Sequence, residues 1–274
     1  NQGPEIYVSA DMEKVTNQAE IALSRAGGLY RRGDAIVWEV LDADPPPEIS
    51  REAGTPTIKI VPPAAVREKL SSGARWTSEE SRTLPPAWVV ETLMARKTWP
   101  KLEPLEAITE TPVLRPGGTI LTVPGYDKPT GIMYRPNATY PLIPDGPTMQ
   151  DIKNAVMTIH DAISTFRFEA MAHMTGLFAA ILTPLARSAF KGPSPLFLFD
   201  SPTPGSGKGK LAKIAAIIAT GRFPASATFP GEEEERRKAI TTYAIEGCRI
   251  VNFDNVVGRL GGAALCKALT EELW

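Results

Sequence analysis

The chain contains 274 residues, and 43% of them are hydrophobic, which is enough to bury the core of one large domain or two modest ones. Its formal net charge of −1 gives no basic signature, so composition alone does not argue for nucleic-acid binding. Two cysteines, Cys248 and Cys266, exclude a disulfide framework, and together with the two histidines they do not form a zinc-ligand array.

Targeting segments are not evident in the sequence. The first residues, NQGPEIYVSAD, have neither the basic leader nor the apolar core of a signal peptide. The longest apolar run, Met174 to Ala186, is too short to span a bilayer and contains Pro184. We therefore expect a cytoplasmic protein without a membrane partner. The first residue, Asn1, and the final Glu-Glu-Leu-Trp look like cuts through a longer protein.

Proline is concentrated in the first half of the chain, which predicts two regions. Residues 1–147 are expected to form a smaller, turn-rich, mixed α+β accessory region that either contacts DNA or supports the ATPase. Residues 148–274 are expected to hold a helical lead-in and a partial ATPase core. The boundary falls near Pro144 to Pro147, because Thr148 and Asp151 then form a capping-box-like helix start that leads to about Thr165.

Apolar spacing and turn residues predict the elements of the first region. The predicted helices are Met12–Ala26, Pro63–Ser72 and Pro86–Lys97; the strands are a hairpin of Leu29–Arg31 with Ala35–Leu41, then Thr57–Val61, and a meander of Val113–Arg115, Thr119–Val123 and Gly131–Tyr134; Asp44 to Pro47 is a loop. Basic residues between Arg67 and Arg82 are placed to contact a phosphate backbone, or they form a solvated surface around a packed Trp76, which is the simpler interpretation.

The second region centres on Pro195 to Gly221, PLFLFDSPTPGSGKGKLAKIAAIIATG. A short apolar strand, Pro195 to Phe199, leads through a turn-forming segment to a helix that opens at Gly207 and lasts to about Thr220. Strand, glycine loop, lysine and helix in this order are typical of a phosphate-binding loop of the Walker A kind. Backbone N–H groups from Gly205 to Lys208 would converge on phosphate oxygens, and the Lys208 ammonium would lie near the β and γ phosphates.

The edges of the loop depart from the usual pattern. Pro202 stands where Gly or Ala is expected, and Gly209 replaces the Ser or Thr whose hydroxyl ligates Mg²⁺. Water or Thr203 would then have to supply that ligand. The alternative is a glycine-rich turn that merely joins a strand to a helix.

A second motif follows the loop helix. A strand at Ala225–Phe229 and an amphipathic helix at Glu232–Glu246 lead to CRIVNFDNV, in which the strand Arg249–Phe253 ends in Asp254. An acid at the carboxyl end of a strand beside the phosphate loop faces the same crevice as the phosphates and can join the Mg²⁺ shell. Taken alone, such an acid is explained equally well by a structural role, in which it caps the next turn.

The residue after this acid bears on hydrolysis. Asn255 can orient a water but cannot take its proton at neutral pH. Either an acid from Glu232 to Glu235 does that work, or the residue comes from outside this chain; the simplest reading of those acids is a solvated helix start that matches the helix dipole. A last helix is expected at Ala263–Leu273.

PLFLFDSPTPGSGKGKLAKIAAIIATGR, followed by RIVNFDNVVGRLGGAALCKALT, resembles the ATPase region of primase-helicase-like proteins from bacteriophages and other mobile elements, which are related to superfamily 3 and poxvirus-type helicases. The upstream phrases LPPAWVVETLMARKTWP and ITETPVLRPGGTILTVPGYDKPTG are also similar to that family. The resemblance thus covers most of the chain, although its upstream phrases are less diagnostic.

The resemblance implies an α/β fold with a P-loop NTPase core of AAA+-like type, truncated at its C-terminal side. It implies a DNA-replication helicase that uses ATP and Mg²⁺, binds single-stranded or forked DNA, and assembles as a homo-oligomer, normally a hexameric ring. Lys208, Asp254 and Asn255 would be the catalytic residues, with Asp254 on the metal. The nucleotide would contact the residues of the loop and first helical turn: Thr203, Pro204, Gly205, Ser206, Gly207, Lys208, Gly209, Lys210 and Leu211. No primase acid cluster or zinc module is evident.

Two other functions remain open at this point. Asn255 and Gly209 favour a nucleotide-gated DNA-binding or scaffold module that binds ATP with little turnover. The GSGKG stretch alone is compatible with a small-molecule phosphotransferase, but no acceptor-binding lid rich in arginine is evident.

Overall fold

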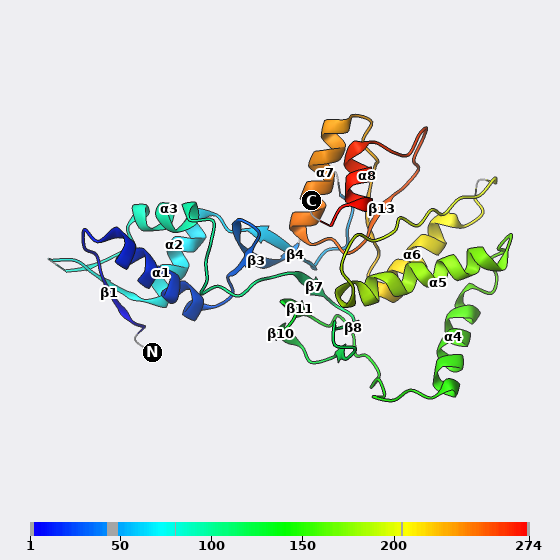
Figure 1. Cartoon of the computed structure of the whole chain (residues 1–274), viewed down its shortest axis with the longest axis horizontal. Coiled ribbons are helices and arrows are strands. Elements are labelled where there is room, and N and C mark those ends of the chain that lie inside the picture. The colour runs from blue at the N-terminus through cyan, green and yellow to red at the C-terminus, as the bar shows by residue number, and fades with distance from the viewer. Residues whose placement is uncertain (1–2, 43–48, 80, 204, 273–274) are drawn as a thin grey trace.

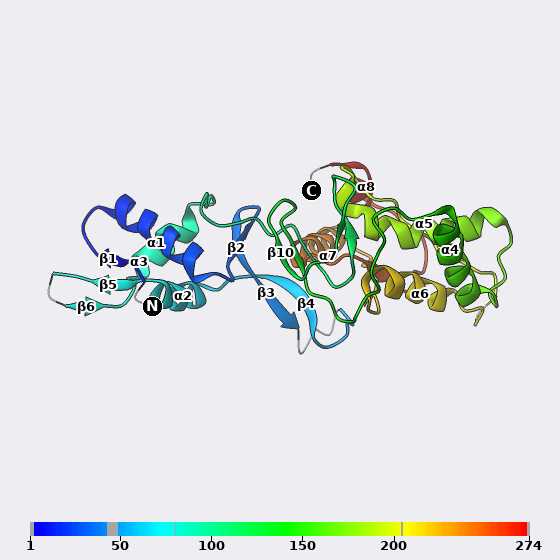
Figure 2. The same cartoon turned by 90° about the horizontal axis from the view of Figure 1, so that it is seen from below.

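The computed structural model describes residues 3–42, 49–79, 81–203 and 205–272, so the predicted loop at Asp44 to Pro47 lies outside the described residues. The fold is mixed α/β, and each of its sheets in this part of the chain has only two or three strands. The helices α1 to α3 gather at one end with β1, β5 and β6, and α4 to α8 lie toward the other, with β3 and β4 between them (Figure 1). The view from below shows the same elongated order (Figure 2).

The amino-terminal end is a small lobe of helices with a three-stranded sheet. Its elements are β1 (Glu5–Tyr7), α1 (Met12–Ala26), α2 (Pro63–Gly73), β5 (Arg75–Thr77), β6 (Arg82–Thr83) and α3 (Ala87–Ala95), in a sheet of order β1-β5-β6. The indole N–H of Trp76 donates to the Leu70 carbonyl at 2.9 Å, and that of Trp99 donates to Leu93 at 2.8 Å. Both rings are almost fully buried, so the interpretation of Trp76 as a packed core residue is confirmed.

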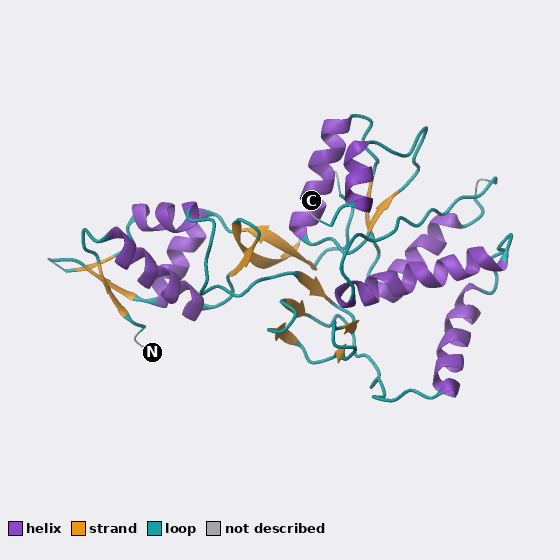
Figure 3. Cartoon of the chain, viewed as in Figure 1, coloured by secondary structure: helices purple, strands orange, loops and turns teal. Residues whose placement is uncertain are grey.

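Strands occupy the middle of the molecule (Figure 3). They comprise the sheet β2 (Tyr30–Arg32), β3 (Ala35–Asp42) and β4 (Thr55–Ile60), the pair β8 (Val113–Leu114) and β9 (Ile120–Leu121), and the sheet β10 (Gly125–Asp127), β11 (Ile132–Tyr134) and β7 (Ala107–Thr109). The hairpin predicted across Gly33 is confirmed, because β2 and β3 pair antiparallel.

The predicted three-strand meander is wrong. Gly125 to Asp127, expected to be a turn, pairs antiparallel with β11, and β11 pairs parallel with β7 rather than with β9. The side chains of β11 are all buried, so this strand lies between two neighbours and leaves the β8–β9 hairpin separate.

The carboxyl-terminal end is mostly helical. It contains α4 (Met149–Ile163), α5 (Met171–Ala186), a 3₁₀ turn (Arg187–Ala189), α6 (Lys208–Thr220), β12 (Ala225–Ala227), α7 (Glu233–Glu246), β13 (Val251–Phe253) and α8 (Ala263–Thr270). The capping box is confirmed, since Thr148 Oγ1 accepts from the Asp151 N–H and the Asp151 carboxylate accepts from the Thr148 N–H. Within the described residues, no helix combines the length and the apolar content that a bilayer crossing requires.

The predicted strand at Pro195–Phe199 is not formed. Phe197 and Phe199 pack against the apolar cluster of α5 and α6, while the Leu198 side chain is 74% exposed. The segment therefore has the alternation of a strand, but in the described part of the chain it belongs to no sheet. The strand that was expected to lie beside it, β13, pairs in parallel with β12 instead.

Contacts cross the boundary near residue 147 in several places. Ser50 forms a two-bond antiparallel bridge with Ser226 of β12, at 2.9 and 2.8 Å. Close by, Arg51 Nη2 lies 2.7 Å from the Glu246 carboxylate, and Lys59 also binds Glu246. Arg51 Nε lies 3.0 Å from Asp42, but the two atoms are not aligned as a hydrogen bond. Asp42, Arg51 and Glu246 are nearly buried, so each of these charges requires its partners.

Replacing Arg51 with Met should destabilise the protein by about 3–5 kcal/mol, because Asp42 and Glu246 would keep their buried charge and lose a partner. Urea unfolding measures the change in free energy. Arg237→Met is the control, since its ion pair with Glu234 is exposed on α7, and it should leave the midpoint unchanged. Equal midpoints for the two variants would show that the Arg51 cluster does not hold the two halves together.

Candidate functional site

The glycine loop turns directly into α6. Gly205 and Gly207 adopt left-handed conformations with φ of 75° and 90°, which favour glycine because it lacks a Cβ. Gly207 is the N-cap of α6, and its carbonyl accepts from the N–H groups of Lys210 at 2.9 Å and Leu211 at 3.1 Å. The sequence prediction of a helix that opens here and ends at Thr220 is confirmed.

The amino-terminal end of α6 has the polar groups that an anion requires. In the described part of the chain, the N–H groups of residues 205–209 donate to no protein acceptor, as expected for the start of a helix. Lys208 is exposed, and its ammonium forms no ion pair with any described carboxylate. Positive dipole, free N–H groups and a lysine at one helix end form a suitable place for phosphate oxygens.

The other predicted loop residues flank this end of the helix. Ser206 is exposed and Gly209 lies in the first turn of α6. The Thr203 N–H donates to Ser201 Oγ at 3.3 Å, and Thr203 is exposed. Pro204 lies outside the described residues.

Asp254 and Asn255 lie in a separate turn at the end of β13. The Asp254 N–H donates to the Ala227 carbonyl at 3.2 Å, which extends the pairing of β13 with β12 by one residue. The Asp254 carboxylate accepts from the Asn255 N–H at 2.9 Å, and Asn255 is left-handed with φ of 53°. Both side chains are exposed.

Figure 1 shows the amino-terminal end of α6 and the carboxyl end of β13 on the same side of the molecule. Among the described residues, no hydrogen bond or ion pair joins Lys208 to Asp254, and no group of three or more His, Cys, Asp or Glu side chains is placed to hold a metal ion. The structure therefore keeps the predicted loop residues together and the predicted metal residues together, but leaves the two groups unconnected.

The acids of α7 are occupied by other contacts. Glu234 pairs with Arg237 and Glu235 with Lys238 on the surface of the helix. The Glu233 carboxylate pairs with Arg236 and also accepts from the Ala264 N–H at 2.5 Å, at the start of α8. These contacts match the interpretation of a dipole-matched helix start, and Glu233 in addition ties α7 to α8.

The chain matches no family model, no curated protein and no solved structure.

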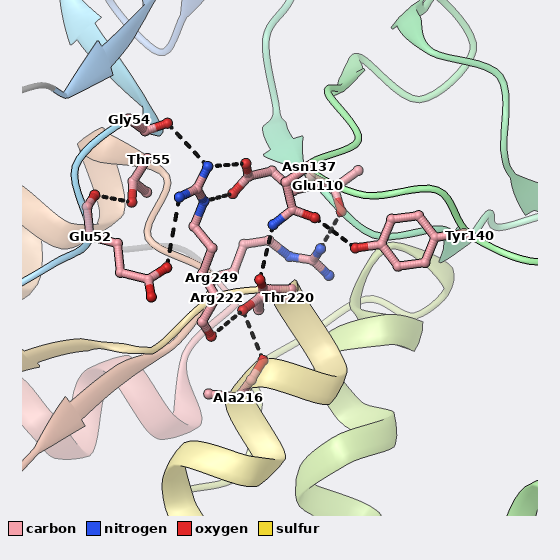
Figure 4. Close-up of polar contacts among 12 residues, drawn as sticks. Glu52, Gly54, Thr55, Glu110, Asn137, Tyr140, Ala216, Thr220, Arg222 and Arg249 are labelled. Carbon is pink, nitrogen blue, oxygen red and sulfur yellow. Dashed lines mark hydrogen bonds and ion pairs between the residues drawn. The ribbon is translucent and has the colours of Figure 1, made fainter.

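The opposite end of α6 is held by the first half of the chain (Figure 4). The Arg222 guanidinium binds Glu110 in a fork, at 2.5 and 2.8 Å, and also donates to the Gly54 carbonyl at 3.3 Å. Asn137 Nδ2 donates to the Gly221 carbonyl at 2.9 Å, and Thr111 Oγ1 donates to Ala219 at 2.9 Å. A fork of this kind is among the stronger and more directional polar contacts in proteins.

Arg249 lies in the same region, and its two acceptors among the described residues are neutral. Its guanidinium donates to Thr109 Oγ1 and to the Pro184 carbonyl, so it connects β7, α5 and the segment before β13. Burial lowers the pKa of Arg249 to about 10, which still leaves the side chain protonated at neutral pH. Sequence reasoning did not identify Arg222 or Arg249, because nothing local distinguishes them from surface arginines.

Cys248 lines a small cavity of about 80 Å³ beside Glu246 and Arg249. Burial raises the pKa of the Cys248 thiol, whereas Cys266 is exposed on α8. Since the thiolate is the reactive form, a raised pKa leaves less of it at neutral pH.

Cys248 should therefore react with iodoacetamide about tenfold or more slowly than Cys266 at pH 7.5, and its rate should continue to rise at higher pH. Peptide mass spectrometry gives both rates from one sample, and Cys266→Ser isolates the slow site. Urea should remove the difference. Equal rates in the native protein would contradict the described packing around Cys248.

Proposed function

We propose that the chain is the nucleotide-binding part of an ATP-dependent DNA helicase or replication ATPase that couples Mg-ATP hydrolysis to DNA unwinding or translocation. The observation that supports it best is the start of α6, where a left-handed Gly207 caps the helix, five successive N–H groups have no described acceptor, and Lys208 is exposed. The triphosphate would lie at this end of the helix, with the Lys208 ammonium near its terminal phosphates.

The metal requirement is compatible with the residues present. Gly209 offers no hydroxyl to the metal. The exposed Asp254 is the carboxylate that the sequence pattern assigns to it. Mg²⁺ commonly keeps several waters and takes one or two carboxylates together with phosphate oxygens, so a single aspartate is a sufficient protein ligand. Asn255 would orient water beside it without removing a proton. For this arrangement the turn at Asp254 and the glycine loop must approach each other when nucleotide binds.

Further parts of the proposal rest on the resemblance in the sequence phrases. They are an AAA+-like P-loop core, single-stranded or forked DNA as partner, a homo-hexameric ring, and a cytoplasmic setting in which both cysteines stay reduced. The exposed Arg75 and Arg82 on the β5–β6 hairpin are a place where a phosphate backbone would meet positive charge.

The second candidate function is a nucleotide-gated DNA-binding or scaffold module with little turnover. It is favoured by one observation, the lack of any described contact between Lys208 and Asp254, because binding needs only the loop whereas hydrolysis needs both groups at the same phosphate. The two candidates share the binding step and differ in turnover.

Lys208→Ala should weaken ATP binding about ten- to a hundredfold, since a charge-assisted hydrogen bond to phosphate is lost. Isothermal titration with and without Mg²⁺ measures the dissociation constant. Lys213→Ala is the matched control, because Lys213 lies on the same helix and contacts Phe223 rather than the loop. Unchanged affinity in Lys208→Ala, or equal losses in the two variants, would rule out the assignment of the loop.

Asp254→Asn should lower Mg²⁺-dependent ATP hydrolysis about tenfold or more and leave metal-free ATP binding unchanged, because only the metal ligand is altered. Phosphate release is measured with and without single-stranded or forked DNA, which should raise the wild-type rate. Asp161→Asn, an exposed acid of α4, is the control. Tight ATP binding with background turnover in the wild type would favour the scaffold module instead.

A further inference from the structure

An aromatic side chain from outside the glycine loop lies directly against it. Phe166 belongs to the segment between α4 and α5, and its Cε1 atom is so close that a Cβ added to Gly207 would meet it at 2.8 Å. Real Cβ atoms essentially never come that near another heavy atom, so the ring fills the space over Gly207. Gly207 thus has two reasons to be glycine, its φ of 90° and the ring above it.

Phe166 is itself held in place from two sides. Its side chain is part of the apolar cluster that includes Phe168, Phe197 and Leu211, the last of these in the first turn of α6. Its backbone N–H donates to the carbonyl of the buried Ile163 at 3.0 Å, which closes the end of α4. The half-buried ring therefore lies against the loop, supported by this cluster and by the hydrogen-bonded backbone at the end of α4.

We propose that Phe166 is a positioning residue of the glycine loop: its ring confines Gly207 to the left-handed conformation that directs the following N–H groups out of the start of α6. Glycine alone does not favour this conformation strongly, since it populates both signs of φ almost equally. Contact with the ring removes alternatives, so the loop is organised before a ligand arrives. This role rests on the proposed nucleotide site but concerns a residue that contacts the loop, not the phosphates.

The effect on ATP affinity follows from the fraction of molecules whose loop is in the binding-competent conformation. When only a fraction of molecules has the competent loop, the apparent dissociation constant rises by the inverse of that fraction. If removal of the ring leaves the loop competent about one tenth of the time, binding weakens about tenfold. Without the ring, the amide hydrogens of Lys210 and Leu211, which donate to the Gly207 carbonyl, should also exchange faster, with or without nucleotide.

Phe166→Ala is compared with Phe168→Ala, which removes the same ring from the same cluster and the same segment but not from Gly207. Hydrogen exchange of the Lys210 and Leu211 amides, which donate to the Gly207 carbonyl, is followed without nucleotide, and ATP affinity is measured by titration. We expect faster exchange and about tenfold weaker ATP binding in Phe166→Ala, near wild-type values for both in Phe168→Ala, and recovery in Phe166→Tyr, which keeps the ring.

Equal effects of the two alanine variants, or unchanged exchange in Phe166→Ala, would overturn the positioning role. If Phe166→Ala does not fold, Phe166→Leu is compared with Phe168→Leu by the same two measurements. Leucine fills the cluster but has no ring edge to reach Gly207, so this pair also tests the positioning role. Absence of ATP binding in the wild type would refute the proposed function, whereas the exchange experiment would still decide whether Phe166 orders the loop.

Discussion

The structure depends on a buried cluster of charges where its two halves meet. Arg51 contacts two carboxylates from different parts of the chain, Asp42 at the end of β3 and Glu246 at the end of α7, and Lys59 shares Glu246. In the described part of the chain, backbone pairing between the halves includes the two-bond bridge of Ser50 with Ser226, but no named sheet spans them. Desolvated charges are costly unless each one is paired, which makes this arrangement specific: a shift of α7 against β4 would leave a charge unpaired.

The same junction fixes one end of α6 and leaves the other end accessible. Arg222 and its fork with Glu110 follow the carboxyl end of the helix, where partial negative charge favours a cation. The glycine loop occupies the opposite end, where partial positive charge favours an anion. A helix of 13 residues is about 20 Å long, so this length separates the glycine loop from Arg222 and the junction.

Local features were predictable from the sequence and non-local ones were not. The capping box at Thr148 and the helix opening at Gly207 depend on neighbours within a few residues, and both predictions were right. The pairing of β13 and the failure of Pro195–Phe199 to join a sheet depend on partners far along the chain, which apolar alternation does not specify. Phe166 carried no signal in the sequence, because an aromatic residue in a loop usually marks core packing; only the contact with Gly207 sets it apart.

Under the proposed function, binding and hydrolysis of a nucleotide would place different demands on this chain. Binding would need the backbone at Gly207 and the charge of Lys208, which belong to one short segment. Hydrolysis would need the Asp254 carboxylate at the same phosphates, and the carboxyl ends of two strands meet at one edge when those strands belong to one parallel sheet. Pro195–Phe199 has apolar side chains on both faces, as strands buried within a parallel sheet do, but Leu198 is exposed. Pairing of this segment with the sheet of β13 would bring the loop to the same sheet edge as Asp254, so under the proposed function turnover would depend on strand pairing and binding on the local backbone.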